Sequence, residues 1–181
     1  MEKTKKPNPF WEDMARPLVV LVVICLVAAA LLGLVNGNTK PVIEANREKT
    51  AAEARQTALP AATSFEKLDV SAELADLGVT GLYKGDNNSG YVATAVSKGY
   101  GGDVTVTVGF GADGKIVKVL ADVGTETTGV GSKVGVADVL ARFEGVSGSA
   151  DDVNLVSGAT YTSKAVRAGV NAAIAAVDSV K

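Results

Sequence analysis

The sequence predicts an α+β protein in which a single N-terminal transmembrane helix is followed by a domain with an antiparallel sheet and a C-terminal helix packed on it. Three observations support this fold class. Residues 18–35 form an uncharged apolar run, residues 103–121 contain two segments typical of paired strands, and residues 164–180 repeat apolar side chains at helical spacing. With 181 residues, the chain is long enough for one globular domain in addition to the membrane helix.

The apolar run is long enough to cross a bilayer. It has eighteen residues without a charged side chain, and a hydrocarbon core of about 30 Å needs about 20 residues of helix. Pro17 precedes the run and Asn36 follows it, so we expect a transmembrane helix over residues 18–36. The alternative is a secretory signal peptide cleaved near Ala30, but apolar residues continue past this position, which favours an uncleaved anchor.

The flanking charges favour a cytoplasmic N-terminus, because four basic residues precede the span and three follow it closely. The expected organisation is a cytoplasmic tail at 1–17, the span at 18–36, a helical stalk and connector at 37–80, and an extracytoplasmic domain at 81–181. The stalk is expected because residues 41–59 are rich in Ala, Glu, Lys and Arg, which are good helix formers.

Strands are expected in the first half of the domain. Residues 91–96 form a short strand candidate, and residues 103–108 alternate so that three valines and then Phe110 face one side. Ala112-Asp113-Gly114 turns the chain, and residues 115–121 return as the second strand of a hairpin.

Helices are expected toward the end of the domain. Residues 134–143 are compatible with a short helix, and residues 153–156 with a further short strand. In the C-terminal helix, one apolar stripe is formed by Val166, Val170, Ile174 and Val177. Thr162 and Ser163 are expected to cap the start of this helix.

Composition excludes several kinds of chemistry. The chain has no histidine and one cysteine, so it cannot form a Ser-His-Asp triad, a histidine-ligated metal site or a cysteine-held iron–sulfur cluster. The part after the span retains 14 basic and 17 acidic side chains of the 18 and 20 in the whole chain, and it has no basic stripe. Nucleic-acid binding is therefore not expected, and redox chemistry would require a cofactor.

Residues 157–163 are the best candidate for a binding site. Their sequence, SGATYTS, leads into the final helix, where unpaired backbone N–H groups and the positive end of the helix dipole favour an anion. Four hydroxyl groups gather there, from Ser157, Thr160, Thr162 and Ser163. An ordinary capped helix explains the same residues, so the local pattern alone indicates only a helix start that suits a phosphate.

The SGATYTS segment resembles the SGATxTS signature of the FMN-binding domain family. This family includes the G subunit of the Rnf electron-transport complex and the C subunit of the sodium-pumping NADH:quinone reductase, and the size of the chain is more similar to the former. The resemblance extends to the span, the segment Thr39–Ile43, the Gly99–Gly102 turn and the loop 126–131, whose sequence ETTGVG is similar to the family's ETPGLG. The chain departs from the family at Asn154, where an Asp is usual.

The resemblance implies a membrane-anchored flavoprotein that carries electrons within an Rnf-type complex. In the family, a flavin transferase links FMN through its phosphate to the Thr of the GAT triplet, which corresponds to Thr160. The other implied cofactor contacts are Ser157, Gly158, Ala159, Tyr161, Thr162, Ser163, Tyr100, Glu126 and Thr127. The implied partners are the other membrane and peripheral subunits of the complex, the flavin transferase during maturation, and membrane lipid.

Such complexes move sodium ions or protons as electrons pass between ferredoxin and NAD. Two other functions fit the same residues. One is the C subunit of a sodium-pumping NADH:quinone reductase. The other is a non-redox, membrane-tethered binding module in which the SGAT turn only begins a helix.

Overall fold

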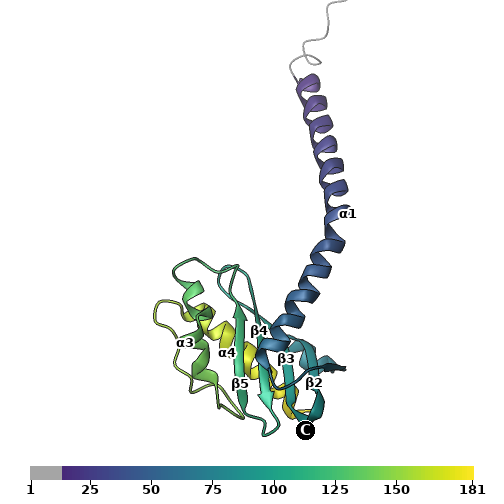
Figure 1. Ribbon diagram of the computed structural model, residues 1–181. Coiled ribbons are helices and arrows are strands. Elements are labelled where there is room, and N and C mark those ends of the chain that lie inside the picture. Colours follow the sequence, from purple (N-terminus) through teal and green to yellow (C-terminus); the bar gives the residue numbers. More distant parts are fainter. Residues whose placement is uncertain (1–13) are drawn as a thin grey trace, which may run out of the picture. The chain divides into compact units, whose positions relative to one another are not determined.

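The computed structural model describes residues 14–181 and combines a long N-terminal helix, an antiparallel sheet and a C-terminal helix, as expected (Figure 1). Most of the tail predicted at residues 1–17 lies outside the described residues. The chain divides into two compact units, Met1–Thr50 and Ala51–Lys181.

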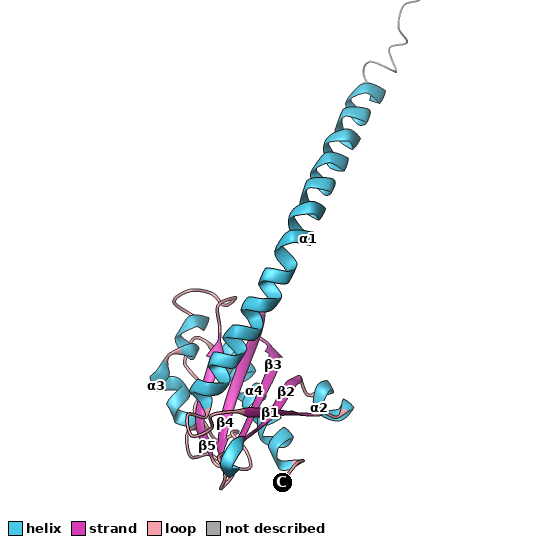
Figure 2. Cartoon of the chain, turned by 45° about the vertical axis from the view of Figure 1, so that its right-hand side comes forward, coloured by secondary structure: helices cyan, strands magenta, loops and turns pink. Residues whose placement is uncertain are grey.

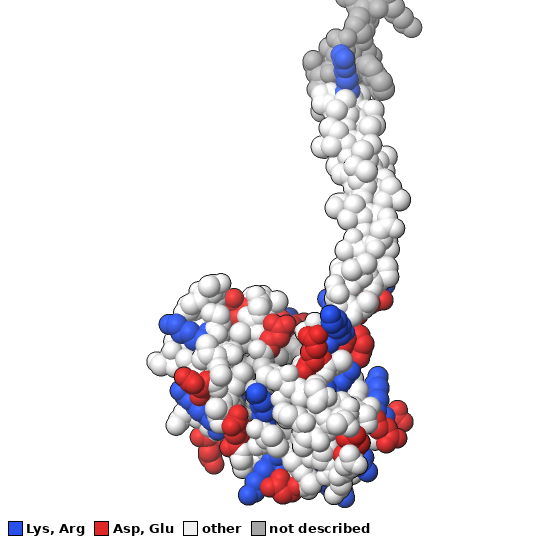
Figure 3. All heavy atoms as spheres, in the orientation of Figure 1, with Lys and Arg blue, Asp and Glu red and all other residues white. Residues whose placement is uncertain are grey.

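The predicted span and stalk form one continuous helix, α1, over Arg16–Ala58. It is long and apolar enough to cross a membrane, and the large apolar side chains between Leu18 and Val35 are exposed, as lipid contact requires. Figure 3 shows no acidic or basic side chain on this stretch of α1, whereas both kinds are spread over the visible face of the domain. Pro41 lies within α1 without ending it.

The sheet has five antiparallel strands in chain order, so that each strand pairs with the next (Figure 2). The strands are β1 (Phe65–Leu68), β2 (Val79–Gly85), β3 (Gly90–Lys98), β4 (Asp103–Gly111) and β5 (Ile116–Asp122). The predicted hairpin is confirmed: the Gly111 N–H donates a 2.9 Å hydrogen bond to the Lys115 carbonyl. Gly114 has φ +80° in this turn, a conformation that glycine adopts without strain.

The structure differs from the sequence prediction in two places. β1, the short helix α2 (Ala72–Asp76) and the start of β2 lie within the segment expected as a connector. Residues 153–156 form no strand, because side chains bond their backbone groups: Arg142 donates to the Asn154 carbonyl, and the Val156 N–H donates to Ser163 Oγ.

The C-terminal helix α4 (Thr160–Asp178) packs on one face of the sheet. Its predicted apolar stripe is confirmed, because all four of its residues are buried in the core that α4 shares with β4. Ser97 on β3 ties the sheet to the helix by donating a 2.6 Å hydrogen bond from Oγ to the Ala165 carbonyl.

The end of α1 packs with a second, smaller core of the domain, formed by Ala58, Leu59, Ala62 and Val92. Gly109 on β4 allows this approach, because a Cβ there would collide with the Ala58 backbone. The stretch expected to hold a short helix contains a 3₁₀ turn (Gly131–Gly135), α3 (Ala137–Leu140) and a second 3₁₀ turn (Ala141–Phe143).

Candidate cofactor site

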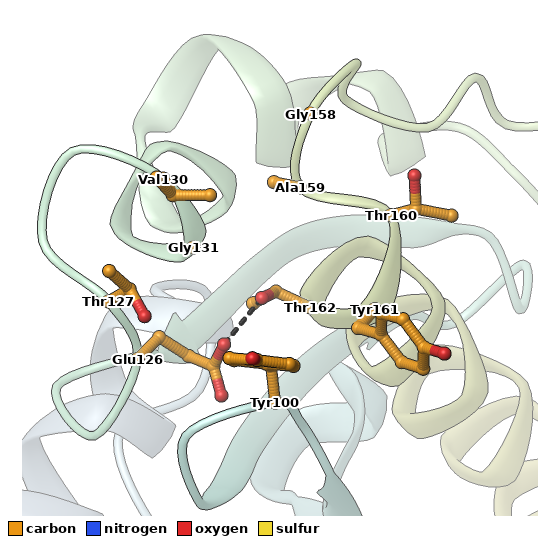
Figure 4. Close-up of a pocket in the computed structure, with 10 residues that line it drawn as sticks. All are labelled: Tyr100, Glu126, Thr127, Val130, Gly131, Gly158, Ala159, Thr160, Tyr161 and Thr162. Carbon is orange, nitrogen blue, oxygen red and sulfur yellow. Dashed lines mark hydrogen bonds between the residues drawn. The ribbon is translucent and has the colours of Figure 1, made fainter.

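A pocket of about 310 Å³ lies where three segments of the domain meet (Figure 4). These segments are the β3–β4 turn, the Gly-rich loop after β5 and the start of α4. The lining residues are Tyr100, Glu126, Thr127, Val130, Gly131, Gly158, Ala159, Thr160, Tyr161 and Thr162. The structure thus brings together every predicted site residue except Ser157 and Ser163.

Thr160 lies at the rim of the pocket, as the first residue of α4. Its side chain is exposed, and the preceding residue, Ala159, occupies the N-cap position without a side-chain cap hydrogen bond. Gly158, with φ +81°, lets the chain turn sharply before the helix. The uncapped helix start presents first-turn N–H groups and the positive end of the dipole beside an exposed hydroxyl, an arrangement that suits a phosphate.

The expectation that Thr162 and Ser163 cap α4 is wrong. The helix already begins at Thr160, so both side chains fall within its first turn and are buried. Thr162 Oγ1 donates a hydrogen bond to Glu126, and Ser163 Oγ accepts one from the Val156 N–H at 3.1 Å. In Figure 4, Thr162 points toward Glu126 and Thr160 points away from it.

Glu126 is the charged residue at the bottom of the site, and 6% of it is exposed. Its carboxylate accepts hydrogen bonds from Thr162 Oγ1 at 2.5 Å and from the Gly101 N–H at 3.0 Å. Two glycines leave space for it, since a Cβ on Gly131 would lie 2.7 Å from Glu126 Oε2 and a Cβ on Gly99 would collide with Oε1.

The environment of Glu126 keeps its carboxyl ionised. The hydrogen bond from Thr162 is the largest cause of a lowered Glu126 pKa; burial opposes this effect, and backbone N–H groups of the β3–β4 turn add to it. Across residues 14–181, the ion pairs that the structure contains do not involve this carboxylate. The site therefore holds a buried negative charge that hydrogen bonds stabilise.

Two tyrosines flank the mouth of the pocket. Tyr100 is 75% exposed and Tyr161 71% exposed, and their ring centroids lie 6.0 Å apart at an interplanar angle of 51°. Tyr161, at the helix start, is thus a surface aromatic and not part of the core. Exposed rings beside a concave site offer flat apolar surfaces for a planar ligand.

Val130 and Gly131 are lining residues that the sequence prediction did not assign to the site. Both belong to the ETTGVG loop, so the resemblance of that loop to ETPGLG was the available signal. Ser157, in contrast, is exposed outside the pocket, and Ser163 is buried behind it.

The segment before the SGAT turn is fastened to α4 through Asp151. Its carboxylate accepts hydrogen bonds from Ser149 Oγ and Asn171 Nδ2, both at 2.9 Å, and its carbonyl accepts one from Arg167 at 2.8 Å. The hydrogen bonds from Ser149 and Asn171 lower the Asp151 pKa. Both carboxylate oxygens are therefore engaged, whereas Asp152, two residues before Asn154, is exposed.

Comparison with known proteins agrees with this geometry. The family model described as FMN-binding domain matches residues 99–175, which include all three walls of the pocket. The chain is 32% identical to the G subunit of the Na(+)-translocating ferredoxin:NAD(+) oxidoreductase complex of Acetobacterium woodii, over 96% of each chain.

Two further relatives carry similar names. The G subunit of the ion-translocating oxidoreductase complex of Methanosarcina acetivorans is 30% identical over 93% of this chain and 95% of its own. The G subunit of the proton-translocating ferredoxin:NAD(+) oxidoreductase complex of Clostridium ljungdahlii is 25% identical over 85% of this chain and 86% of its own.

Proposed function

The chain belongs to the FMN-binding family of Rnf-type complex G subunits, and from this premise we propose that it is the membrane-anchored flavin subunit of an ion-translocating ferredoxin:NAD oxidoreductase. It would relay electrons between other subunits rather than oxidise or reduce ferredoxin or NAD itself. Its relatives favour this function over a quinone-reductase subunit or a non-redox binding module, because those compared above are named as G subunits of ion-translocating oxidoreductases.

The pocket at the uncapped start of α4 is the observation that carries this proposal. FMN has a phosphate, a polar ribityl chain and a planar ring system, and the site offers a matching surface for each. The Thr160 hydroxyl and the first-turn N–H groups suit the phosphate, and the tyrosines at the mouth suit the ring. Bound flavin would supply the one- and two-electron chemistry that these side chains lack.

We propose that the flavin is attached covalently through Thr160. A flavin transferase would join Thr160 Oγ1 to the FMN phosphorus of a flavin dinucleotide: the Oγ1–P bond forms, the bond from that phosphorus to the second phosphate breaks, and the nucleoside monophosphate leaves with the hydroxyl proton. The chain gains FMN less one water. Thr160 is suited to this role because its side chain is exposed at the helix start, while Thr162 is buried against Glu126. The remaining negative charge of the phosphate would lie at the positive end of the α4 dipole.

We further propose that the N-terminus is cytoplasmic and that the domain lies on the other side of the membrane. A covalent link would prevent loss of the cofactor where FMN cannot be replenished. The apolar part of α1 would contact lipid and the membrane subunits of the complex.

The proposal is tested by coexpressing the chain with a flavin transferase and measuring flavin fluorescence of the denatured band together with intact mass. We expect a fluorescent wild type that is heavier by one FMN less one water, and a dark Thr160→Ala variant. Ser157→Ala is the matched control, since it removes an exposed hydroxyl of the same turn outside the pocket.

Thr162→Ala is also expected to keep the flavin, because the buried Thr162 hydroxyl is already bonded to Glu126. A dark Thr162 variant with a fluorescent Thr160 variant would show that the acceptor is assigned wrongly. A dark wild type, with a control substrate labelled in parallel, would contradict a flavin function and favour the tethered binding module.

A further inference from the structure

We propose that Glu126 is a positioning residue that joins the three walls of the pocket, and that its buried negative charge lowers the reduction potential of the flavin bound there. This inference rests on the proposed function, because it requires flavin in the pocket.

The hydrogen bonds of Glu126 connect all three walls. The residue itself belongs to the Gly-rich loop, its Oε1 accepts from Gly101 in the β3–β4 turn, and its Oε2 accepts from Thr162 on α4. Figure 4 shows the carboxylate beside the side chains of Tyr100 and Thr162. One side chain thus bonds to both neighbouring walls. Its removal would let the distance between the walls vary around a bound planar ligand.

The packing around Glu126 leaves its carboxylate one place to lie. A Cβ on Gly131 would lie 2.7 Å from both Cβ and Oε2 of Glu126, and a Cβ on Gly99 would collide with Oε1. Only glycine, which has no Cβ, leaves this space free. Gly131 and Gly99 therefore make room for the carboxylate. The arrangement is therefore a built site for a negative charge and not a loop carboxylate that folds inward by chance.

The charge acts on the flavin because it is buried and is not neutralised by an ion pair among the described residues. Nearby titratable side chains on the three walls are exposed, where solvent screens their charges: Lys98, Tyr100, Asp103, Asp122, Lys133, Tyr161 and Lys164. A flavin that accepts two electrons from a donor subunit and one proton from solvent gains one negative charge. A fixed negative charge in a poorly solvated wall disfavours that form.

The test is the midpoint potential of the flavin in the full-length, FMN-loaded chain in detergent micelles at pH 8. Glu126→Gln removes the charge and keeps the size of the side chain. We expect it to favour the reduced flavin about tenfold, which for a two-electron couple is a positive shift of about 30 mV. Glu144→Gln is the matched control, because Glu144 is exposed and precedes Gly145, whose N–H donates to the Ile116 carbonyl at the opposite end of β5 from the pocket loop. Its potential is expected to equal that of the wild type.

Thr162→Val separates charge from geometry. It removes the hydrogen bond and leaves the carboxylate, so the potential at pH 8 is expected to stay at the wild-type value. Without that bond the Glu126 pKa rises, so as the pH is lowered the potential of the Thr162 variant is expected to turn positive at a higher pH than that of the wild type. This pH comparison remains decisive where Glu126→Gln does not fold.

Three outcomes would contradict the role of Glu126, its electrostatic effect or the flavin function itself. A Glu126→Gln protein that carries flavin at the wild-type potential would overturn the inference. Equal shifts in Glu126→Gln and Thr162→Val at pH 8 would overturn its electrostatic part, because loosened walls would then explain both. Absence of flavin from the wild type would instead refute the proposed function, and flavin absorbance distinguishes this case from the other two.

Discussion

Glu126 and Thr162 lie 36 residues apart in the sequence, yet the Thr162 hydroxyl donates a hydrogen bond of 2.5 Å to the Glu126 carboxylate inside the pocket wall. The two residues belong to elements that meet only after the sheet and α4 have packed together. The bond therefore couples the pocket to the packing of the domain: it forms only when α4 is in place, and it helps to hold α4 against the Gly-rich loop.

Gly131→Ala is expected to destabilise the domain by about 1–3 kcal/mol. The added Cβ would lie 2.7 Å from Glu126 Oε2 and 2.8 Å from Thr162 Oγ1, so the bond between them must open. Gly124→Ala in the same loop is the control, because its Cβ would meet a flexible Asp122 oxygen at 3.1 Å and nothing else within 4 Å. Equal losses of free energy of unfolding in the two variants would show that the contact with Glu126 does not cause the destabilisation of Gly131→Ala.

The fold class followed from local patterns because the central strands and α4 have strong ones. Val104, Val106 and Val108 alternate on β4, and the four apolar residues of the α4 stripe repeat at helical spacing; all are buried. β1 was missed because its sequence, FEKL, is a short edge strand with its charged middle residues exposed. Its pairing with β2 depends on partners that no local window contains.

The candidate site was predicted as a set of residues but not as a geometry. The resemblance named Tyr100, Glu126 and Thr160 from segments far apart in the sequence, and the fold brings them to one pocket. Local reasoning made Thr162 and Ser163 helix caps, because hydroxyl residues near a helix start usually cap it. The helix begins earlier than expected, and tertiary packing uses both hydroxyls elsewhere.

Acid is expected to remove the contribution of Glu126 to stability. Its folded-state pKa is lowered, and an unfolded Glu has a pKa of about 4.3. At pH values between the two, the unfolded state binds more protons. The contribution is therefore full above about pH 5 and is lost as the pH falls through the folded-state pKa.

The pH profile of unfolding tests this expectation. Glu126→Gln should be less stable than the wild type at pH 7, by about 2 kcal/mol for a lost charge-assisted hydrogen bond. The difference should shrink as the pH falls below the unfolded-state pKa of about 4.3, because the unfolded carboxyl then binds a proton before the folded one does. Near-ultraviolet circular dichroism of the tyrosines reports the unfolding of the domain, and Glu144→Gln serves as the control. A difference between Glu126→Gln and the wild type that does not change with pH would contradict an ionised Glu126.

Gly109→Ala is expected to separate the end of α1 from β4. A Cβ at this position would lie 2.5 Å from the Ala58 carbonyl carbon and 3.2 Å from Ala58 Cβ, and the neighbouring backbone cannot yield without moving the helix. We expect a loss of about 1–3 kcal/mol in the free energy of unfolding, together with faster exchange of amide protons at residues 51–58.

Gly111→Ala is the matched control for Gly109→Ala. It lies two residues further along β4, where its Cβ would meet the flexible Asp113 side chain at 2.9 Å and Val117 at 3.5 Å. It should therefore leave exchange at 51–58 unchanged. Faster exchange at residues 51–58 in both variants would show that any methyl group added to β4 has this effect, and that the contact between Gly109 and Ala58 is not its specific cause.

The proposed orientation across the membrane is open to a direct labelling test. Asp76→Cys places a thiol on α2, in an exposed position away from the residues that line the pocket. In intact spheroplasts, a membrane-impermeant maleimide is expected to label this variant. The wild type supplies the baseline, since its one cysteine, Cys25, lies inside the apolar part of α1. Labelling that requires disruption of the spheroplasts would place the flavin domain in the cytoplasm, where FMN is available and covalent attachment is not needed to retain it.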